Sequence, residues 1–295
     1  MKKYCGLVSI IGEPNAGKST LVNALVGQKI SIVTPKVQTT RFNVRGVMTS
    51  DNYQFVFIDT PGIFDAPEKF EKAMVKAAWA GAGDADCILL LIDARRGITD
   101  NLHAVLKKLS TFNDKPIYCA INKLDKVDKE RLLELATALK EFTFLREIFF
   151  ISALKSDGLD SLVNVFKKAM PEGEFLYPDD SVSDIQMRML AAEITREKLF
   201  MMMAQELPYA CLVETESWEE HDTRVVISQV IYVQRDAHKK MVIGDKGAMA
   251  KRIGSSARRE LEKMLEKKVH LSLFVKVSAG WKDDSGTYRL LGLDG

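Results

Sequence analysis

The chain has 295 residues, of which 46% are hydrophobic and 28% charged, and this length favours two domains over a single core. A net charge of +2 excludes a generally basic chain, so any surface for nucleic acid must be local. The four cysteines are scattered without a CxxC pair, which indicates reduced thiols in a cytoplasmic protein and excludes a disulfide framework or a zinc site.

The first predicted element is a buried strand over Leu7–Ile11. The apolar residues after Met1-Lys2-Lys3 resemble a signal peptide only superficially, because they are few and run directly into a glycine-rich loop. No apolar run in the chain approaches the roughly 20 residues that span a bilayer.

A GxxxxGK[ST] motif follows this strand and leads into a predicted helix over residues 20–26, closed by Gly27. A phosphate-binding P-loop requires this context, because its glycines let backbone N–H groups turn toward phosphate oxygens at a helix N-terminus. Lys18 is expected to supply charge to the β- and γ-phosphates, and the Ser19 hydroxyl to ligate Mg²⁺. The predicted nucleotide contacts here are Gly12, Glu13, Pro14, Asn15, Ala16, Gly17, Lys18, Ser19 and Thr20.

The next motif, Asp59-Thr60-Pro61-Gly62, follows a predicted strand over Tyr53–Ile58. Asp59 can reach Mg²⁺ through its water shell, and the Gly62 N–H can point at a γ-phosphate. Thr40 is the expected Mg²⁺ ligand from a mobile loop, with Thr39 as the alternative. The predicted metal ligands are Ser19, Thr40 and Asp59, and Thr60 and Pro61 complete this part of the nucleotide site.

Apolar strands then alternate with amphipathic helices up to residue 169. The predicted strands are Cys87–Ile92, Pro116–Ile121 and Ile148–Ile151, and the predicted helices are Phe70–Ala80, Asn101–Ser110, Lys129–Phe142 and Leu159–Ala169. This alternation predicts an α/β fold with a doubly wound, mainly parallel sheet. In such sheets a nucleotide binds at the carboxyl ends of the strands.

Two motifs at later strand ends indicate a guanine nucleotide. The Asp125 carboxylate in Asn122-Lys123-Leu124-Asp125 can accept hydrogen bonds from guanine N1–H and the 2-amino group, which adenine lacks. The Lys123 stem can cover one face of the base. In Ser152-Ala153-Leu154, the Ala153 amide can donate to guanine O6.

The composition changes after residue 172, where prolines, glycine and acidic residues predict a linker over 173–184. We therefore expect a first domain over 1–172 and a second over 185–295. The second is predicted as a helix over Asp184–Gln205 with Ser183 or Asp184 as its N-cap, followed by two strands, two helices and a strand. The ranges are Tyr209–Glu216, Arg224–Gln234, Ala237–Ile243, Ala248–Lys267 and Val269–Val277.

Gly244-Asp245-Lys246-Gly247 lies between the last two helices and matches the GxxG loop of a KH module. From His238 to Lys268 there are ten Lys or Arg against four Asp or Glu, a surplus of six. An apolar groove involving Ile243 and Ile253 could take unstacked bases. The predicted RNA contacts are Ile243, Gly244, Asp245, Lys246, Gly247, Lys251 and Arg252.

The motifs between Gly12 and Leu154 resemble the translation-factor-like branch of P-loop GTPases. Together with Gln38-Thr39-Thr40-Arg41, Glu206-Leu207-Pro208-Tyr209 and the GxxG segment, the whole chain resembles the Era family, in which a GTPase domain precedes a smaller α+β type II KH domain. The resemblance implies GTP and GDP as ligands, Mg²⁺ as cofactor and a monomeric protein. It also implies binding to the 3′ end of small-subunit ribosomal RNA, a role in assembling that subunit, and loose association with the inner face of the membrane.

The sequence lacks a recognisable water-orienting glutamine and a recognisable arginine finger. Ile63 follows the Asp-x-x-Gly element, where Ras-like proteins carry a water-orienting glutamine. Arg41 and Arg45 are candidates for an arginine finger, but no sequence feature supports either. We therefore expect slow hydrolysis that depends on Lys18, Thr40 and Gly62. Related GTPases use an asparagine at the position of Asn15 to hold K⁺, which makes K⁺ a second cofactor to test.

Two other functions stay open at this point. One is a KH-type RNA-binding module that nucleotide merely stabilises, with little hydrolysis. The other is a membrane-associated signalling GTPase that docks through its basic face.

Overall fold

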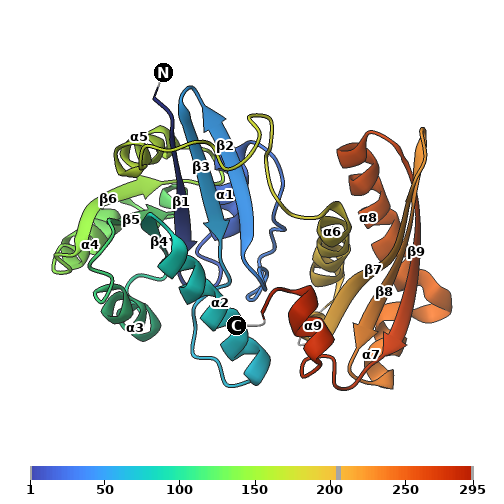
Figure 1. Ribbon diagram of the computed structural model, residues 1–295. Helices are drawn as coiled ribbons and strands as arrows, with labels where there is room; N and C mark the ends of the chain where they lie inside the picture. The colour runs from blue at the N-terminus through green and yellow to red at the C-terminus, as the bar shows by residue number, and fades with distance from the viewer. Residues whose placement is uncertain (1, 204–206, 294–295) are drawn as a thin grey trace. The chain divides into compact units, whose positions relative to one another are not determined.

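The structure is a computed structural model that describes residues 2–203 and 207–293 (Figure 1). The described residues form two compact units. The first contains residues 2–31, 37–184 and 291–293, and the second contains Ile32–Lys36 and the described part of Ile185–Leu290. The two units are described separately below.

The first unit is built on a six-stranded sheet in the order β2-β3-β1-β4-β5-β6, parallel except for β2. Its strands are β1 (Tyr4–Ile11), β2 (Val44–Ser50), β3 (Tyr53–Asp59), β4 (Cys87–Asp93), β5 (Ile117–Asn122) and β6 (Leu145–Ile151). Its α-helices are α1 (Lys18–Val26), α2 (Lys69–Asp84), α3 (Asp100–Leu109), α4 (Lys129–Leu139) and α5 (Leu159–Ala169). The predicted doubly wound α/β fold is confirmed.

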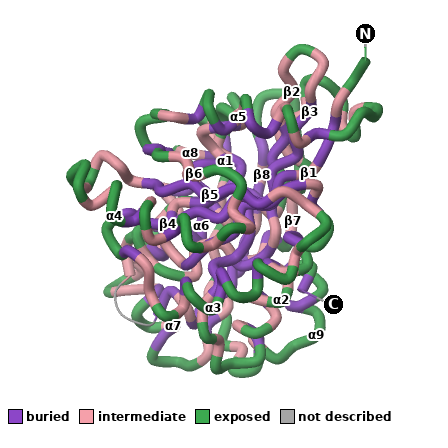
Figure 2. Tube along the Cα trace, turned by 90° about the vertical axis from the view of Figure 1, so that its left-hand side faces the viewer, coloured by how far each residue is buried: buried purple, intermediate pink, exposed green. Residues whose placement is uncertain are grey.

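Helices cover both faces of this sheet, so its central strands are buried along most of their length (Figure 2). On one face, α2, α3 and α4 pack through residues such as Ala78, Leu106 and Leu139 against the apolar side chains of β4 and β5. On the other face, Phe166 of α5 contacts Phe57 and lies edge-on to Tyr118. Burial on both faces explains why these strands read as continuous apolar runs.

Strand β2 was missing from the sequence-based prediction. It runs antiparallel to β3 through a tight turn at Asp51, whose φ is 54°. Its sequence mixes exposed Arg45 with Gly46 and polar residues, as expected for an edge strand with only one partner. A Cβ on Gly46 would lie 2.8 Å from Val26 of α1, so the glycine allows the helix to pack closely on this strand.

The second unit has a three-stranded sheet in the order β7-β8-β9, with β7 (Cys211–Glu220) antiparallel and β9 (Lys268–Val277) parallel to β8 (Arg224–Val233). Its α-helices are α6 (Met187–Met202), α7 (Asp236–Ile243), α8 (Ala248–Leu265) and α9 (Ser285–Leu290). The order α6-β7-β8-α7-α8-β9 confirms the predicted type II KH arrangement, and α9 is an element that the prediction lacked.

The limits of α6 were predicted too wide. The helix begins after Gln186, which is its N-cap, and ends at Met202, so neither Ser183 nor Asp184 caps it. Ser183 instead donates its hydroxyl to the Arg45 carbonyl oxygen at 2.6 Å. The predicted end at Gln205, and Glu206 of the motif quoted above, lie outside the described residues.

Residues 173–184 contain no helix or strand and follow the edge of the first unit. The Leu176 and Tyr177 amides both donate to Gln54 Oε1, and the Val47 amide donates to the Val182 carbonyl. Among the described residues, no helix is both long enough and apolar enough to cross a membrane.

Candidate nucleotide and RNA sites

The P-loop joins β1 to α1 and depends on two glycines with positive φ. Gly12 has a φ of 156° and Gly17 a φ of 101°. A Cβ on Gly17 would lie 2.4 Å from the Asn122 amide nitrogen, and one on Gly12 would lie 2.3 Å from the Leu91 carbonyl oxygen. Only glycine fits either position, because both the backbone conformation and the close neighbours exclude a side chain.

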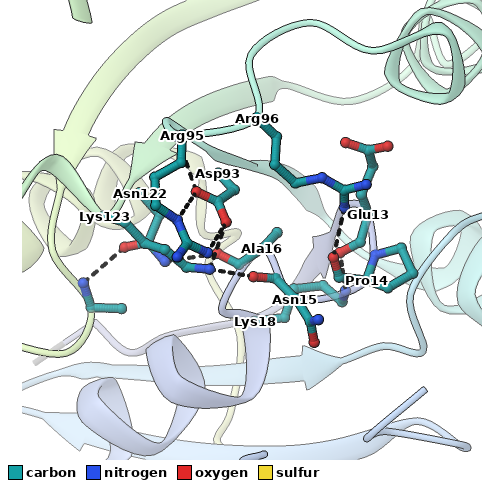
Figure 3. A network of polar contacts seen from close by, with 11 residues as sticks. Glu13, Pro14, Asn15, Ala16, Lys18, Asp93, Arg95, Arg96, Asn122 and Lys123 are labelled. Atoms are coloured by element: carbon teal, nitrogen blue, oxygen red, sulfur yellow. Dashed lines mark hydrogen bonds and ion pairs between the residues drawn. The ribbon is translucent and has the colours of Figure 1, made fainter. Parts of the chain in front are cut away.

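Side-chain donors bind the carbonyl groups of the P-loop, and Figure 3 shows those on Glu13, Pro14, Asn15 and Ala16. Lys18 Nζ donates to Gly12 O and Glu13 O, Arg96 to Pro14 O, Lys123 to Asn15 O and Asn122 to Ala16 O, at 2.5–3.3 Å. These bonds engage five consecutive carbonyls and so fix the path of the loop. The Ala16 amide also donates within the loop, to Glu13 O at 3.3 Å, and the other loop amides are candidates to line a phosphate cradle.

Lys18 is nearly enclosed by the loop, with 6% of its surface exposed. Burial lowers the pKa of its ammonium to about 8, although Asp59 and Glu13 act in the opposite direction. An anionic phosphate placed beside it would favour the charged form again. The residue is therefore well placed to pair with phosphate.

The three predicted metal ligands lie together. Ser19 Oγ is 2.8 Å from Thr40 Oγ1, and Thr40 Oγ1 is 3.4 Å from Asp59 Oδ2. This contact favours Thr40 over Thr39. Asp59 is fully buried, its Oδ1 has no hydrogen-bond partner within the described residues, and burial raises its pKa. A buried carboxylate oxygen beside two hydroxyls fits the oxygen ligands that Mg²⁺ requires.

The start of the loop after β3 is fastened to the P-loop. Gly62 lies so close to Pro14 that a Cβ would be 2.8 Å from its ring, and the Ile63 amide donates to Gly12 O at 3.0 Å. The Asn101 side-chain amide donates both to Ile63 O at 2.9 Å and to Glu13 Oε1 at 3.0 Å. The Gly62 amide is thereby held beside the phosphate cradle.

Thr60 and Pro61 are buried next to this contact, and Thr60 Oγ1 donates to the Ile10 carbonyl at 2.8 Å. Thr20 is half-buried in the first turn of α1. Neither threonine hydroxyl has a shown role with nucleotide, so both stay predictions.

The predicted guanine-binding residues also lie together. Ser152 Oγ donates to Asp125 Oδ1 at 2.7 Å, and this hydrogen bond is the main reason why the pKa of Asp125 is lowered. The Asp125 side chain is 6% exposed. The Ala153 amide donates to Asn122 Oδ1 at 2.9 Å, so a bond to guanine O6 would have to be shared with or replace this one. Leu154 is largely exposed.

Both arginines considered as an arginine finger make other contacts. Arg41 is 1% exposed, with its guanidinium over the Phe70 ring at 5.8 Å. Arg45 lies on the outer strand β2, and its Nη1 is 3.6 Å from Asp184 Oδ2. The structure assigns both to packing and surface contacts of the first unit.

In the second unit, Gly244 and Gly247 both have positive φ, 73° and 82°. Gly244 has a ψ of 178°, a conformation nearly confined to glycine, and a Cβ there would lie 2.7 Å from Met249. Lys246 between them also has a positive φ, of 46°. Asp245 and Lys246 are exposed and Ile243 is half-buried, so the loop presents its tip to solvent.

The acidic and basic residues of α8 differ in their contacts. Its acidic residues Glu260 and Glu262 are used within the unit, the first in an ion pair with Lys198 and the second accepting from the Val269 amide. The basic residues remain exposed, namely Lys251, Arg252, Arg258, Arg259 and Lys263. The basic surplus of the sequence therefore becomes a basic surface that begins at the GxxG loop.

One predicted feature of this surface is wrong. Ile253 does not line an exposed groove, because it is fully buried in the core with Val242 and Ile231. Helical periodicity turns Ile253 inward and leaves its neighbours Lys251 and Arg252 outside.

Four residues that contact the P-loop or Lys123 were not predicted from the sequence: Asp93, Arg96, Thr99 and Asn101. All of them follow or end β4, and they contact P-loop residues or, in the case of Asp93, Lys123. A signal was present, because Asp93 ends a buried strand in the same way as Asp59 and Asn122 end theirs.

The folds and sites define the class of protein as a P-loop GTPase domain followed by a KH domain. A family model described as a 50S ribosome-binding GTPase matches residues 7–123, and a KH domain model matches residues 206–282. The GTPase Era of Mesorhizobium japonicum is 52% identical over 292 residues, covering 99% of this chain and 94% of that protein. The GTPase Era of Sinorhizobium medicae is 51% identical and covers 98% and 93%.

Solved structures similar to this chain are also Era proteins. An Era in complex with MgGDPNP and nucleotides 1506–1542 of 16S ribosomal RNA has a TM-score of 0.93 at 40% identity, covering 99% of both chains. An Aquifex aeolicus Era variant bound to GDP and AlF₄⁻ has the same score, identity and coverage. The chain therefore belongs to the Era family of GTPases.

Proposed function

We propose that this protein is a guanine-nucleotide switch that hydrolyses GTP and binds the 3′ end of small-subunit ribosomal RNA through its KH unit, assisting assembly of that subunit. The observation that carries the first half is the convergence of the P-loop, the Ser19–Thr40–Asp59 group and the Asp125–Ser152 pair at the carboxyl ends of neighbouring strands. This is where a doubly wound sheet binds a nucleotide.

The hydrolysis step is in-line attack of water on the γ-phosphate. Lys18, the loop amides and the Gly62 amide would take up charge on the phosphate oxygens. Ser19, Thr40 and Asp59 would hold Mg²⁺, which supplies positive charge to the β- and γ-phosphates. Ile63 has no side-chain hydrogen-bonding group to orient the water, which supports slow intrinsic turnover.

The RNA half of the proposal rests on the exposed GxxG loop and the basic face of α8. In KH modules this loop clamps about four nucleotides through their sugar–phosphate backbone. The solved relative with a 16S ribosomal RNA fragment suggests which RNA to test.

The deciding experiment measures phosphate release from GTP with and without an RNA that carries the 3′ end of small-subunit ribosomal RNA. We expect slow release alone and a severalfold increase with RNA. No release under either condition would favour a KH module that nucleotide only stabilises. Release that RNA leaves unchanged, with binding to vesicles that resists RNase, would favour a membrane-associated signalling GTPase; peripheral membrane association stays part of this test.

We also propose K⁺ as a second cofactor, held beside the phosphates by Asn15. The residue sits in the P-loop with a φ of 64°, a left-handed conformation that asparagine tolerates better than most residues. Its carbonyl is fixed by Lys123. A cation at this position would supply the charge that an arginine finger gives in other GTPases.

This proposal predicts that hydrolysis is about tenfold or more faster in KCl than in NaCl at equal ionic strength. Asn15→Gly should remove the difference while leaving GDP binding intact, because glycine accepts the same positive φ without a side chain. Equal rates of the unmodified protein in the two salts would contradict the proposal.

A further inference from the structure

Strand β4 lies between the two strands that lead into the nucleotide motifs. In the sheet order it is flanked by β1, which enters the P-loop, and by β5, which enters the Asn122–Asp125 motif. Asp93 is the last residue of β4 and pairs in register with Asn122. Its side chain therefore lies at the carboxyl end of the sheet, between the P-loop and the Asn122–Asp125 motif, as Figure 3 shows.

The Asp93 side chain is buried, with 3% of its surface exposed, and its carboxylate forms ion pairs with Arg95 and Lys123. Its Oδ2 accepts from Lys123 Nζ at 2.7 Å, and both oxygens accept from the Arg95 side chain at 2.7–3.0 Å. Burial alone would raise the pKa of Asp93, but the hydrogen bonds from Arg95 and Lys123 outweigh burial and lower it. The carboxylate thus stays ionised.

Lys123 needs such a partner. It has a left-handed backbone, with a φ of 68° and a ψ of 36°, and a long side chain that is costly to order. Its ammonium bridges Asp93 Oδ2 and the Asn15 carbonyl, the latter at 2.5 Å. This bridge fixes the stem of the side chain that is expected to cover the guanine base, and it joins that motif to the P-loop.

We infer that Asp93 is a positioning residue for nucleotide binding, which holds Lys123 in place over the base site and against the P-loop before the nucleotide arrives. Asp93 acts through Lys123 and does not itself touch the nucleotide. The inference rests on the proposed binding of guanine nucleotide.

The test measures release of a fluorescent GDP analogue from the full-length protein by stopped flow. Asp93→Asn keeps the shape of the side chain but removes its charge, so release should become about tenfold faster. Lys123→Ala should accelerate release at least as much. The double variant should release GDP no more than about twofold faster than Lys123→Ala alone, because Asp93 then has nothing to position.

Two variants serve as controls. Arg95→Ala removes the other ion pair of the same carboxylate, and since the Arg95 side chain is half-exposed, release should stay within about twofold of the unmodified protein. Asp93→Glu keeps the charge and should stay within about threefold. If Asp93→Asn does not fold, Asp93→Ser replaces it. The Arg95 backbone amide donates to Asp93 Oδ1 at 3.0 Å, and a serine hydroxyl can accept this bond.

Effects of Asp93→Asn and Lys123→Ala that multiply in the double variant would overturn the inference, because Asp93 would then act independently of Lys123. Failure of the unmodified protein to bind the analogue would instead contradict the proposed function. The two failures are therefore distinguishable within one assay.

Discussion

Asp125→Asn is expected to weaken GTP binding by about 10²–10⁴-fold and to transfer the preference to xanthosine triphosphate. The carboxylate accepts from two donors of guanine, whereas an amide would turn its N–H toward them. Xanthine has a carbonyl oxygen in place of the 2-amino group and can accept from that N–H. Equilibrium competition between the two nucleotides for the purified variant measures the change.

Ser152 determines how the new amide of Asp125→Asn would be oriented. Its hydroxyl donates to Asp125 Oδ1, so it would retain the amide oxygen of the Asp125→Asn variant and leave the NH₂ facing the base. Adding Ser152→Ala releases the amide to rotate, and the preference for xanthosine triphosphate should shrink. Unchanged GTP affinity in Asp125→Asn would show that the guanine site has been assigned incorrectly.

Gly247→Asp is expected to reduce RNA affinity on the order of 100-fold while nucleotide binding is retained. A Cβ at Gly247 meets no atom within 4 Å, so the new side chain fits and costs only the strain of a φ of 82°, about 1–2 kcal/mol. Its carboxylate would, however, stand where the loop is expected to meet RNA phosphates. Filter binding of a ribosomal RNA fragment and GDP titration of the same preparation give the two readouts.

Gly280→Asp is the matched control, because Gly280 is exposed and its Cβ also meets open space. The charge change is the same in the same unit, so RNA affinity should fall by no more than about threefold. Equal losses in the two variants would indicate a general charge effect, and full RNA binding by Gly247→Asp would contradict the KH assignment.

Much of the candidate nucleotide site was predictable from local sequence. Glycines and polar residues at strand ends mark the P-loop, Asp59, Asn122 and Asp125, because a parallel sheet gathers its carboxyl ends at one edge. Asp93 had the same kind of position but no motif to mark it. Its role depends on β4 lying between β1 and β5, and strand order is set by packing across the whole sheet.

The errors have similar causes. Edge strand β2 lacks the apolar run of a buried strand, since only one neighbour pairs with it. Ile253 was placed in a groove because sequence spacing gives the face of a helix but not what packs on that face.

The sequence by itself determined the class of fold, the phosphate cradle, the choice of guanine and the presence of a KH loop, because each depends on residue types at fixed local spacing. Only the tertiary structure decided which side chains at the ends of other strands, or just after them, bind the carbonyl groups of the P-loop. Lys123, Arg96 and Asn122 are distant from the P-loop in sequence, and their bonds to its carbonyls exist because neighbouring strands end side by side. Asp93 emerges between these motifs for the same reason.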